Sequence, residues 1–270
     1  MKKRILAALL VFVALLTGCN RKETPGQWPS QKIEIDVCYT AGGTADTVAR
    51  QLSALMSQQL STTFNLVNVT GGSGSIAGQQ VYAAAHDGYT WLGDVAHTVS
   101  GWRTLGYADL GWEDFYGFYA ASSPYVLFVS GNSPYQTAQQ LFDAMRGDPS
   151  MKWGNAGLGS INQLTGSLML EKLGLKGNSV PYDGGRSAAI KVVAGEVTWS
   201  WCGLSDILDL AQSGDIRILG ICDSSPREID CAKGNYTVPS LLDDYPELSD
   251  LQGLLYWGFR VSRDTPADAV

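Results

Sequence analysis

The nine residues from Cys38 to Asp46 read Cys-Tyr-Thr-Ala-Gly-Gly-Thr-Ala-Asp and combine features that bind anions. Gly42 and Gly43 allow backbone angles that other residues resist. A helix that begins directly after such a loop directs unpaired amide hydrogens and a partial positive charge outward. The segment therefore predicts an anion site. An ordinary connecting turn is the alternative, because Gly-Gly turns before helices are common in α/β proteins.

The elements on both sides of this loop follow from hydrophobic periodicity. Apolar and acidic residues alternate over 33–37, which predicts a strand with one apolar face. Apolar residues recur at helical spacing over 48–60, which predicts a helix. Either Thr44 or Asp46 is expected to cap the start of that helix.

The order of strand, glycine loop and helix recurs along the chain. Residues 64–69 predict a second strand, and the glycine-rich run 70–78 leads into a helical stretch over 79–85. This run lacks the Lys-Ser/Thr ending of a phosphate loop, so nucleotide binding is only weakly indicated. In the second half, a strand over 152–155, the loop 156–160 and a helix over 161–173 repeat the pattern. This alternation predicts mainly parallel sheets, with ligands bound beyond the carboxyl ends of the strands.

The first residues predict export and lipid attachment. Three basic residues follow Met1, and the apolar run 5–16 is too short to span a bilayer as a helix. The sequence Leu-Thr-Gly-Cys at 16–19 resembles the bacterial lipobox, in which cleavage leaves a lipid-bearing Cys19 at the N-terminus. We therefore expect a lipoprotein signal peptide over 1–18 and a polar tether over 19–29. An ordinary signal peptide with a chance cysteine is the alternative.

Composition excludes several classes of partner. Removal of residues 1–18 would leave 16 basic residues against 26 acidic ones and a net charge of −10. Such a balance argues against nucleic acid, which needs clustered Lys and Arg. Two histidines and no Cys-x-x-Cys spacing argue against a zinc site, and no metal or cofactor is expected.

Cys38, Cys202, Cys222 and Cys231 allow three disulfide pairings, of which Cys222–Cys231 is the first to test.

Several motifs in a fixed order resemble those of one family, the substrate-binding receptors of tripartite tricarboxylate transporters, also called Bug receptors. The resemblance covers most of the chain after the signal peptide. Its motifs here are the loop 38–46, Asn68 with the glycine run 71–77, and the segments 86–90, 123–127, 157–160 and 180–185.

The resemblance implies a two-lobed α/β fold of the periplasmic-binding-protein type II, with a ligand cleft between the lobes. The first lobe would comprise residues 30–124 and 255–270, and the second lobe residues 125–254. The chain ends at Val270, where family members usually continue, so we expect either a fragment or a shortened first lobe.

The resemblance also implies a function. It indicates a lipid-anchored, extracytoplasmic receptor that captures a small organic carboxylate and delivers it to a membrane permease. The site residues that it implies come from the two first-lobe loops and from an opposing wall: Tyr39, Ala41, Gly42, Gly43, Thr44, Asp46, Gly72, Ser73, Gly74 and Ser75, with Gly159, Ser160, Gln163 and Cys202 opposite. Gln163, Asp183 and Cys202 depart from the family's His, Lys and Asp, which leaves the identity of the ligand open.

A hydrolase and a ligand-sensing lipoprotein are the two alternative functions. A hydrolase would use Ser160 or Cys202 as nucleophile, but no histidine occurs after His97 to serve as its base in a Gly-x-Ser-x-Gly arrangement. A ligand-sensing lipoprotein of the same fold, without a permease, is the second alternative. Gene neighbourhood would discriminate it from a transport receptor.

Overall fold

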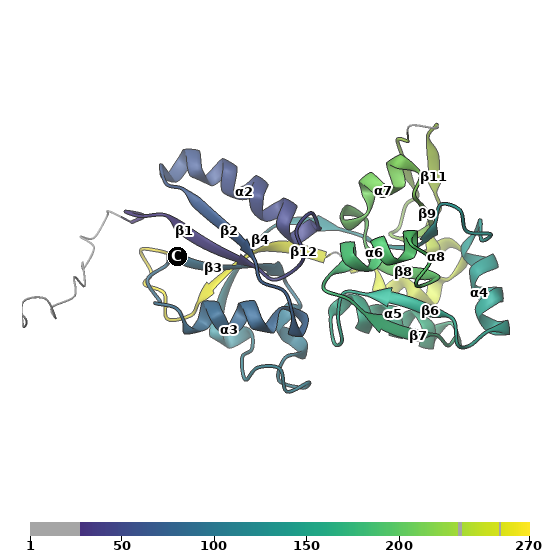
Figure 1. The fold of residues 1–270 in the computed structure, drawn as a ribbon, viewed down its shortest axis with the longest axis horizontal. Coiled ribbons are helices and arrows are strands. Elements are labelled where there is room, and N and C mark those ends of the chain that lie inside the picture. Colours follow the sequence, from purple (N-terminus) through teal and green to yellow (C-terminus); the bar gives the residue numbers. More distant parts are fainter. Residues whose placement is uncertain (1–27, 232–233, 254) are drawn as a thin grey trace, which may run out of the picture.

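The chain forms two lobes, each built on a five-stranded sheet (Figure 1). The computed structural model describes residues 28–231, 234–253 and 255–270. We call the part built on the sheet β2-β1-β3-β12-β4 the first lobe, and the part built on the sheet β7-β6-β8-β5-β9 the second lobe. The expected signal peptide, Cys19 and most of the expected tether lie outside the described residues.

The first lobe places helices on both faces of its sheet (Figure 1). Ile33, Ile35 and Val37 are fully buried, as the alternation in the sequence predicts. β1 pairs in parallel with β2 and β3, whereas β12 pairs antiparallel with β3 and β4. The elements of this lobe are β1 (Ile33–Val37), α2 (Thr44–Leu60), β2 (Phe64–Asn68), η1 (Gly72–Gly74), α3 (Ser75–Ala83), β3 (Thr90–Val95), η2 (Thr98–Gly101), η3 (Trp112–Asp114), β4 (Phe115–Ser123) and β12 (Leu255–Ser262).

The second lobe repeats this arrangement and adds a small hairpin. β6 pairs in parallel with β7 and β8, and β5 pairs antiparallel with β8 and β9. Its elements are β5 (Tyr125–Ser130), α4 (Ala138–Gly147), β6 (Lys152–Asn155), α5 (Ile161–Lys172), β7 (Asn178–Pro181), α6 (Gly185–Val193), β8 (Trp199–Gly203), η4 (Leu204–Asp206), α7 (Leu208–Ser213), β9 (Ile216–Cys222), the hairpin β10 (Arg227–Ile229) and β11 (Tyr236–Val238), α8 (Leu241–Asp244) and η5 (Pro246–Leu251).

The prediction of mainly parallel sheets is wrong, since each large sheet has two parallel and two antiparallel pairings. The reason lies in the connections between the lobes. The chain passes from β4 to β5 through Pro124 alone, with no crossover helix, and it returns as β12. Strands inserted in this way run against their neighbours, because only a crossover connection makes consecutive strands parallel.

In the described part of the chain, the structure tests the expected disulfide and shows whether any helix could span a membrane. Cys38, Cys202, Cys222 and Cys231 are all free thiols, so the Cys222–Cys231 disulfide is not formed. The Cys222 thiol lies 3.8 Å from the Leu248 carbonyl, whereas that of Cys231 lies 3.3 Å from the Ala211 carbonyl. Among the described helices, none has the length and apolar character to cross a membrane.

A buried ion pair fixes β12 in the first lobe. Arg260 on β12 and Asp94 on β3 are each 1% exposed, and the Arg260 Nε donates to Asp94 Oδ2 at 2.6 Å. Arg260 also donates to the Ala96 carbonyl, and its guanidinium carbon lies 4.5 Å from the centre of the Trp112 ring. Burial raises the pKa of Asp94 to about 6, against the opposing effect of Arg260. At neutral pH the pair is therefore ionised and joins the returning strand to the sheet.

We expect Asp94→Ala to lower the free energy of unfolding by about 3–5 kcal/mol, because it leaves the Arg260 charge buried and unpaired. Urea unfolding at pH 7 measures this loss. The matched control is Asp109→Ala, since the Asp109 side chain is 99% exposed and pairs with Arg103 at the surface. That change should cost about 1 kcal/mol or less. Equal losses in the two variants would contradict a structural role for the buried pair.

Candidate functional site

The loop between β1 and α2 is held by a network around Asp46. The Gly42 amide donates to Asp46 Oδ2 at 3.0 Å, and Asn68 donates to both the Tyr39 carbonyl and Asp46 Oδ1. Burial raises the pKa of Asp46, but the hydrogen bonds from Arg50, Gly42 and Asn68 outweigh it and hold the pKa below its usual value. The carboxylate therefore stays ionised and fixes the loop.

The expected helix cap is wrong in its detail. The N-cap of α2 is Gly43, and no side chain caps this helix. Asp46 reaches past the cap to the Gly42 amide, and the Thr44 hydroxyl points to Ser205 in the second lobe, 2.8 Å away. The amide at the start of α2 thus remains available for an acceptor outside its own loop.

The second loop of the first lobe turns through residues with positive φ. Gly71, Gly72 and Gly74 have φ values of 115°, 54° and 87°, and Ser73 between them has φ 50°. Such angles favour glycine, which explains the run of glycines in this loop. The Ser73 hydroxyl donates to the Leu158 carbonyl in the second lobe at 2.7 Å.

The second lobe presents a matching loop before α5. Gly157 and Gly159 have φ values of 122° and 75°. Ser160 is the N-cap of α5, and its hydroxyl accepts from the Gln163 amide at 3.2 Å. The Gln163 side chain in turn accepts from the Gly159 amide at 2.7 Å. Ser160 and Gln163 therefore hold their own loop in shape.

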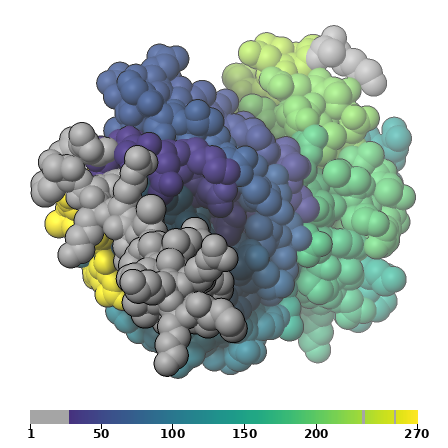
Figure 2. Space-filling model, turned by 60° about the vertical axis from the view of Figure 1, so that its left-hand side comes forward, coloured from purple at the N-terminus to yellow at the C-terminus, as the bar shows by residue number. Residues whose placement is uncertain are grey.

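Besides that of Ser73, the lobes are connected by a hydrogen bond from the Ser205 amide to the Ser123 hydroxyl at 3.1 Å and by four more at the loops, where the first-lobe and second-lobe atoms meet (Figure 2). The Thr40 amide donates to the Asp183 carbonyl at 3.3 Å, and the Ser187 hydroxyl donates to the Thr40 hydroxyl at 3.1 Å. Thr44 makes the other two: its hydroxyl bonds to Ser205, and its amide donates to Asp206 Oδ1 at 2.8 Å. The start of α2 therefore binds a carboxylate that comes from the other lobe.

A cavity of about 530 Å³ lies between the lobes. Both lobes line it. The first lobe contributes Cys38, Tyr39, residues 71–74 and Tyr107, and the second lobe contributes residues 156–158, residues 181–183, Ser187 and Lys191. Lys191 Nζ lies 2.8 Å from the Glu196 carboxylate, so its charge is locally balanced.

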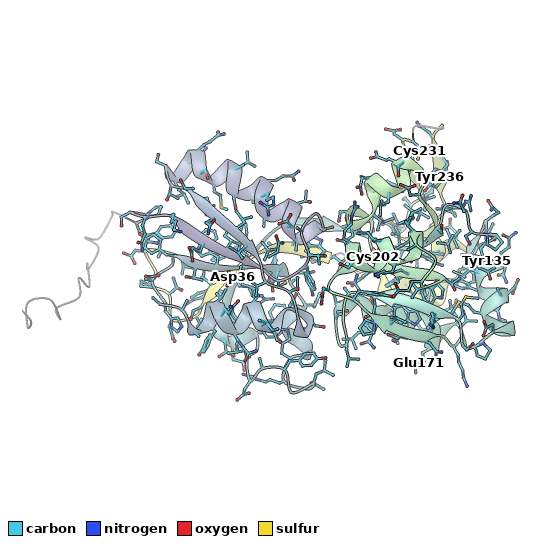
Figure 3. The ribbon with its side chains drawn as sticks, in the orientation of Figure 1. Asp36, Tyr135, Glu171, Cys202, Cys231 and Tyr236 are labelled. Carbon is cyan, nitrogen blue, oxygen red and sulfur yellow. The ribbon has the colours of Figure 1, made fainter. Side chains whose placement is uncertain are left out.

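A larger cavity, of about 650 Å³, lies wholly in the second lobe. It is bounded by the start of α4, the end of α7, β9 and the hairpin, where Figure 3 labels Cys231 and Tyr236. Because only one lobe lines it, a relative movement of the lobes would not enclose a ligand there. The interlobe cavity is the better candidate site for that reason.

The structure brings together only part of the predicted site. Tyr39, Gly72, Ser73 and Gly74 line the interlobe cavity, and Tyr39, Gly43 and Thr44 line a small void beside it. The remaining predicted residues line neither space: Ala41, Gly42, Asp46, Ser75, Gly159, Ser160, Gln163 and Cys202. Sequence reasoning missed Ser187, Lys191 and Asp206, which follow no recognisable motif. The Gly184-Gly185 pair, which lies between Asp183 and Ser187, could have marked a third loop.

Neither proposed nucleophile is arranged for hydrolysis. Cys202 lies in β8 of the second lobe (Figure 3) and is fully buried, and burial raises the pKa of its thiol well above the usual range. A protonated thiol is a poor nucleophile. The Ser160 hydroxyl is engaged as a helix cap. His86 contacts Tyr82 and Asp264 in the first lobe, and His97 lies against Trp112 there, so neither imidazole pairs with these groups.

Comparison with known proteins gives one family. The model of the TctC family, the tripartite tricarboxylate transporter family receptor, matches residues 48–229. The chain belongs to this family. Its members are transport receptors and not enzymes, in agreement with the arrangement of Ser160 and Cys202.

Sequence relatives of this receptor family are distant. A protein of Pseudomonas sp. from the tcbD-tcbE intergenic region is 29% identical over 201 residues, which cover 73% of this chain and 59% of that protein. Protein BugT of Bordetella pertussis is 25% identical over 228 residues, which cover 82% of this chain and 69% of BugT. The chain thus spans less than two thirds of the length of the Pseudomonas relative.

Solved structures confirm the two-lobed α/β fold of periplasmic binding proteins. MatC from Rhodopseudomonas palustris with bound malate has a TM-score of 0.79 at 21% identity, covering 90% of this chain and 81% of MatC. An R. palustris protein with adipate has a TM-score of 0.78 at 25% identity, covering 90% of this chain and 80% of that chain. The periplasmic binding protein BugD has a TM-score of 0.77 at 22% identity, covering 90% of this chain and 80% of BugD.

We expect Gly43→Val to separate the lobes while the first lobe stays folded. Gly43 has φ −78° and ψ 173°, which valine adopts readily. A Cβ there would lie 3.3 Å from the Thr40 carbonyl oxygen of its own loop, 3.5 Å from Arg186 Cβ and 3.6 Å from Asp206 Oδ1, so the methyl groups of valine would press on the second lobe. Small-angle scattering should give a larger radius of gyration, with the free energy of unfolding changed by about 1 kcal/mol or less.

The matched control for this variant is Gly147→Val at the end of α4, where an added Cβ meets nothing within 4 Å. It should leave the radius of gyration unchanged. A radius for Gly43→Val equal to that of the control would show that the lobes do not close on Gly43.

Proposed function

We propose that this chain is an extracytoplasmic receptor that binds a small organic carboxylate between its two lobes and delivers it to a membrane permease. The observation that carries the proposal is the interlobe cavity, because loops from both lobes line it and each lobe alone offers only half of the site. A ligand held by both lobes favours the arrangement in which they meet. A permease can then distinguish the loaded receptor by its shape.

The chemistry of the loops supports a carboxylate as ligand. Glycine-rich turns with positive φ expose backbone amides, and the start of α2 adds a partial positive charge. The Thr44 amide already donates a hydrogen bond to a carboxylate, that of Asp206. Two proteins of similar fold were solved with adipate and with malate, which are dicarboxylates. The cavity of about 530 Å³ is large enough for ligands of this size.

We expect a carboxylate from a panel of mono-, di- and tricarboxylates to raise the melting temperature. A ligand at one hundred times its dissociation constant stabilises the folded state by about 2.7 kcal/mol. For a chain of this size that corresponds to roughly 5–10 °C. Thermal unfolding of the chain with each compound measures the shift, and the matched uncharged amides serve as controls. A panel in which no carboxylate shifts the melting temperature more than its amide would contradict the proposal.

The proposal includes a lipid anchor at Cys19, which lies outside the described residues. Its support is the lipobox-like sequence at 16–19 and the apolar run before it. Several acyl chains on one residue would hold the receptor stably at a membrane surface, since each buried methylene contributes about 0.8 kcal/mol. The folded lobes would then stand close to the permease that they serve.

We expect Cys19→Ser to release the protein from membranes, because none of the described helices could cross a membrane in place of the lipid anchor. Membrane fractionation of cells that express each form measures this. Cys231→Ser is the control, since this thiol lies far along the chain in the second lobe and should leave the protein membrane-bound. Retention of Cys19→Ser in the membrane fraction would sink the anchoring proposal.

A further inference from the structure

We propose that the Asp206 carboxylate is an internal competitor of the ligand: it occupies the start of α2, holds the two lobes together, and must leave before a ligand carboxylate can bind there. The inference rests on the proposed function for the identity of the ligand. Its structural part, that Asp206 holds the lobes together, stands on contacts within the chain.

The carboxylate of Asp206 lies in a cradle made for it. Asp206 is 4% exposed at the end of η4, and its Oδ1 accepts from the Thr44 amide at 2.8 Å. Two glycines border the carboxylate from opposite lobes. A Cβ at Gly185 would lie 2.5 Å from Oδ2, and a Cβ at Gly43 would lie 3.6 Å from Oδ1. The lobes therefore meet closely around this one side chain.

Among the described residues, no basic side chain donates a hydrogen bond to this carboxylate. The positive charge of Arg186 acts on Asp206, but the Arg186 guanidinium donates its hydrogen bonds to the Asp209 carboxylate and to the main-chain carbonyl of Asp206. The negative charge of Asp206 is held instead by the Thr44 amide at the positive end of α2. This is the place that an external carboxylate would take, since the amide at a helix start is the anion-binding group.

Two carboxylates cannot share one amide at the start of a helix. A second anion at this amide would meet the charge of Asp206, and like charges at contact distance oppose each other strongly in a buried site. The ligand therefore displaces Asp206. Displacement also breaks the pairing of Ser205 with Thr44, because Ser205 is the preceding residue of η4. The Asp206 carboxylate therefore lowers the affinity of the receptor for other carboxylates.

The experiment compares the whole chain with Asp206→Ala and with the control Asp209→Asn. The control changes the neighbouring carboxylate, which is 64% exposed and pairs with Arg186, without touching the start of α2. Small-angle scattering without added carboxylate tests the contact between the lobes, and calorimetry with malate tests the competition. We expect Asp206→Ala to have a larger radius of gyration and to bind malate at least tenfold more tightly than the unchanged chain. The control should match the unchanged chain in both measurements.

Asp206→Asn serves if the alanine variant does not fold, because it keeps the shape and one acceptor oxygen while it removes the charge. It should shift both measurements in the same direction. An unchanged radius and unchanged malate affinity in a folded Asp206 variant would overturn the inference, as would weaker malate binding, which would make Asp206 a ligand contact.

The two proposals fail in different ways. If malate binds the unchanged chain and the Asp206 variants keep its radius, the proposed function stands and the inference is wrong. If the radius increases but no carboxylate of the panel binds any form, Asp206 holds the lobes together and the proposed function is wrong.

Discussion

The hydrogen bond from the Thr44 amide to the Asp206 carboxylate is the contact on which the arrangement of the two lobes depends. A helix start carries amides without partners in the helix, and they must be satisfied from elsewhere. No side chain of its own loop caps α2, because Asp46 is turned back to Gly42 and Arg50. The second lobe supplies the missing acceptor. The geometry of the first loop therefore makes sense only in the presence of the second lobe.

The connections between the lobes allow this contact to form and to break. The chain passes between the lobes at Pro124 and again between Leu251 and Leu255. Buried packing continues through this region, where the Leu255 side chain lies against Gly203 and Tyr39 lies edge-on to Trp257. Two covalent connections beside a packed contact are typical of a hinge. At the loops, on the far side of the interface from these connections, the lobes are joined mainly by individual hydrogen bonds, such as those of Thr44 and Ser73.

One departure from the family pattern lies at this same place. The resemblance puts an acidic residue at position 202, where this chain has a buried cysteine. Asp206, one short helical turn later, brings its carboxylate against Gly185, and the Cβ of Cys202 lies against the same glycine. Arg186 and Asp209 form an ion pair beside them. The carboxylate beside this glycine therefore comes from Asp206, which directs it at the start of α2.

The sequence by itself determined the local elements and the family. The alternation over 33–37 predicts β1, and the helical spacing over 48–60 predicts α2, because each depends on neighbours along the chain. Only the tertiary structure decided which loop residues face the cavity, since Ser160 and Gln163 are turned to their own helix start. It also decided that β5 and β12 run antiparallel, and that Asp206, 162 residues from Thr44, is its partner. Contacts between residues so far apart depend on how two lobes dock, and no periodicity in the sequence records that.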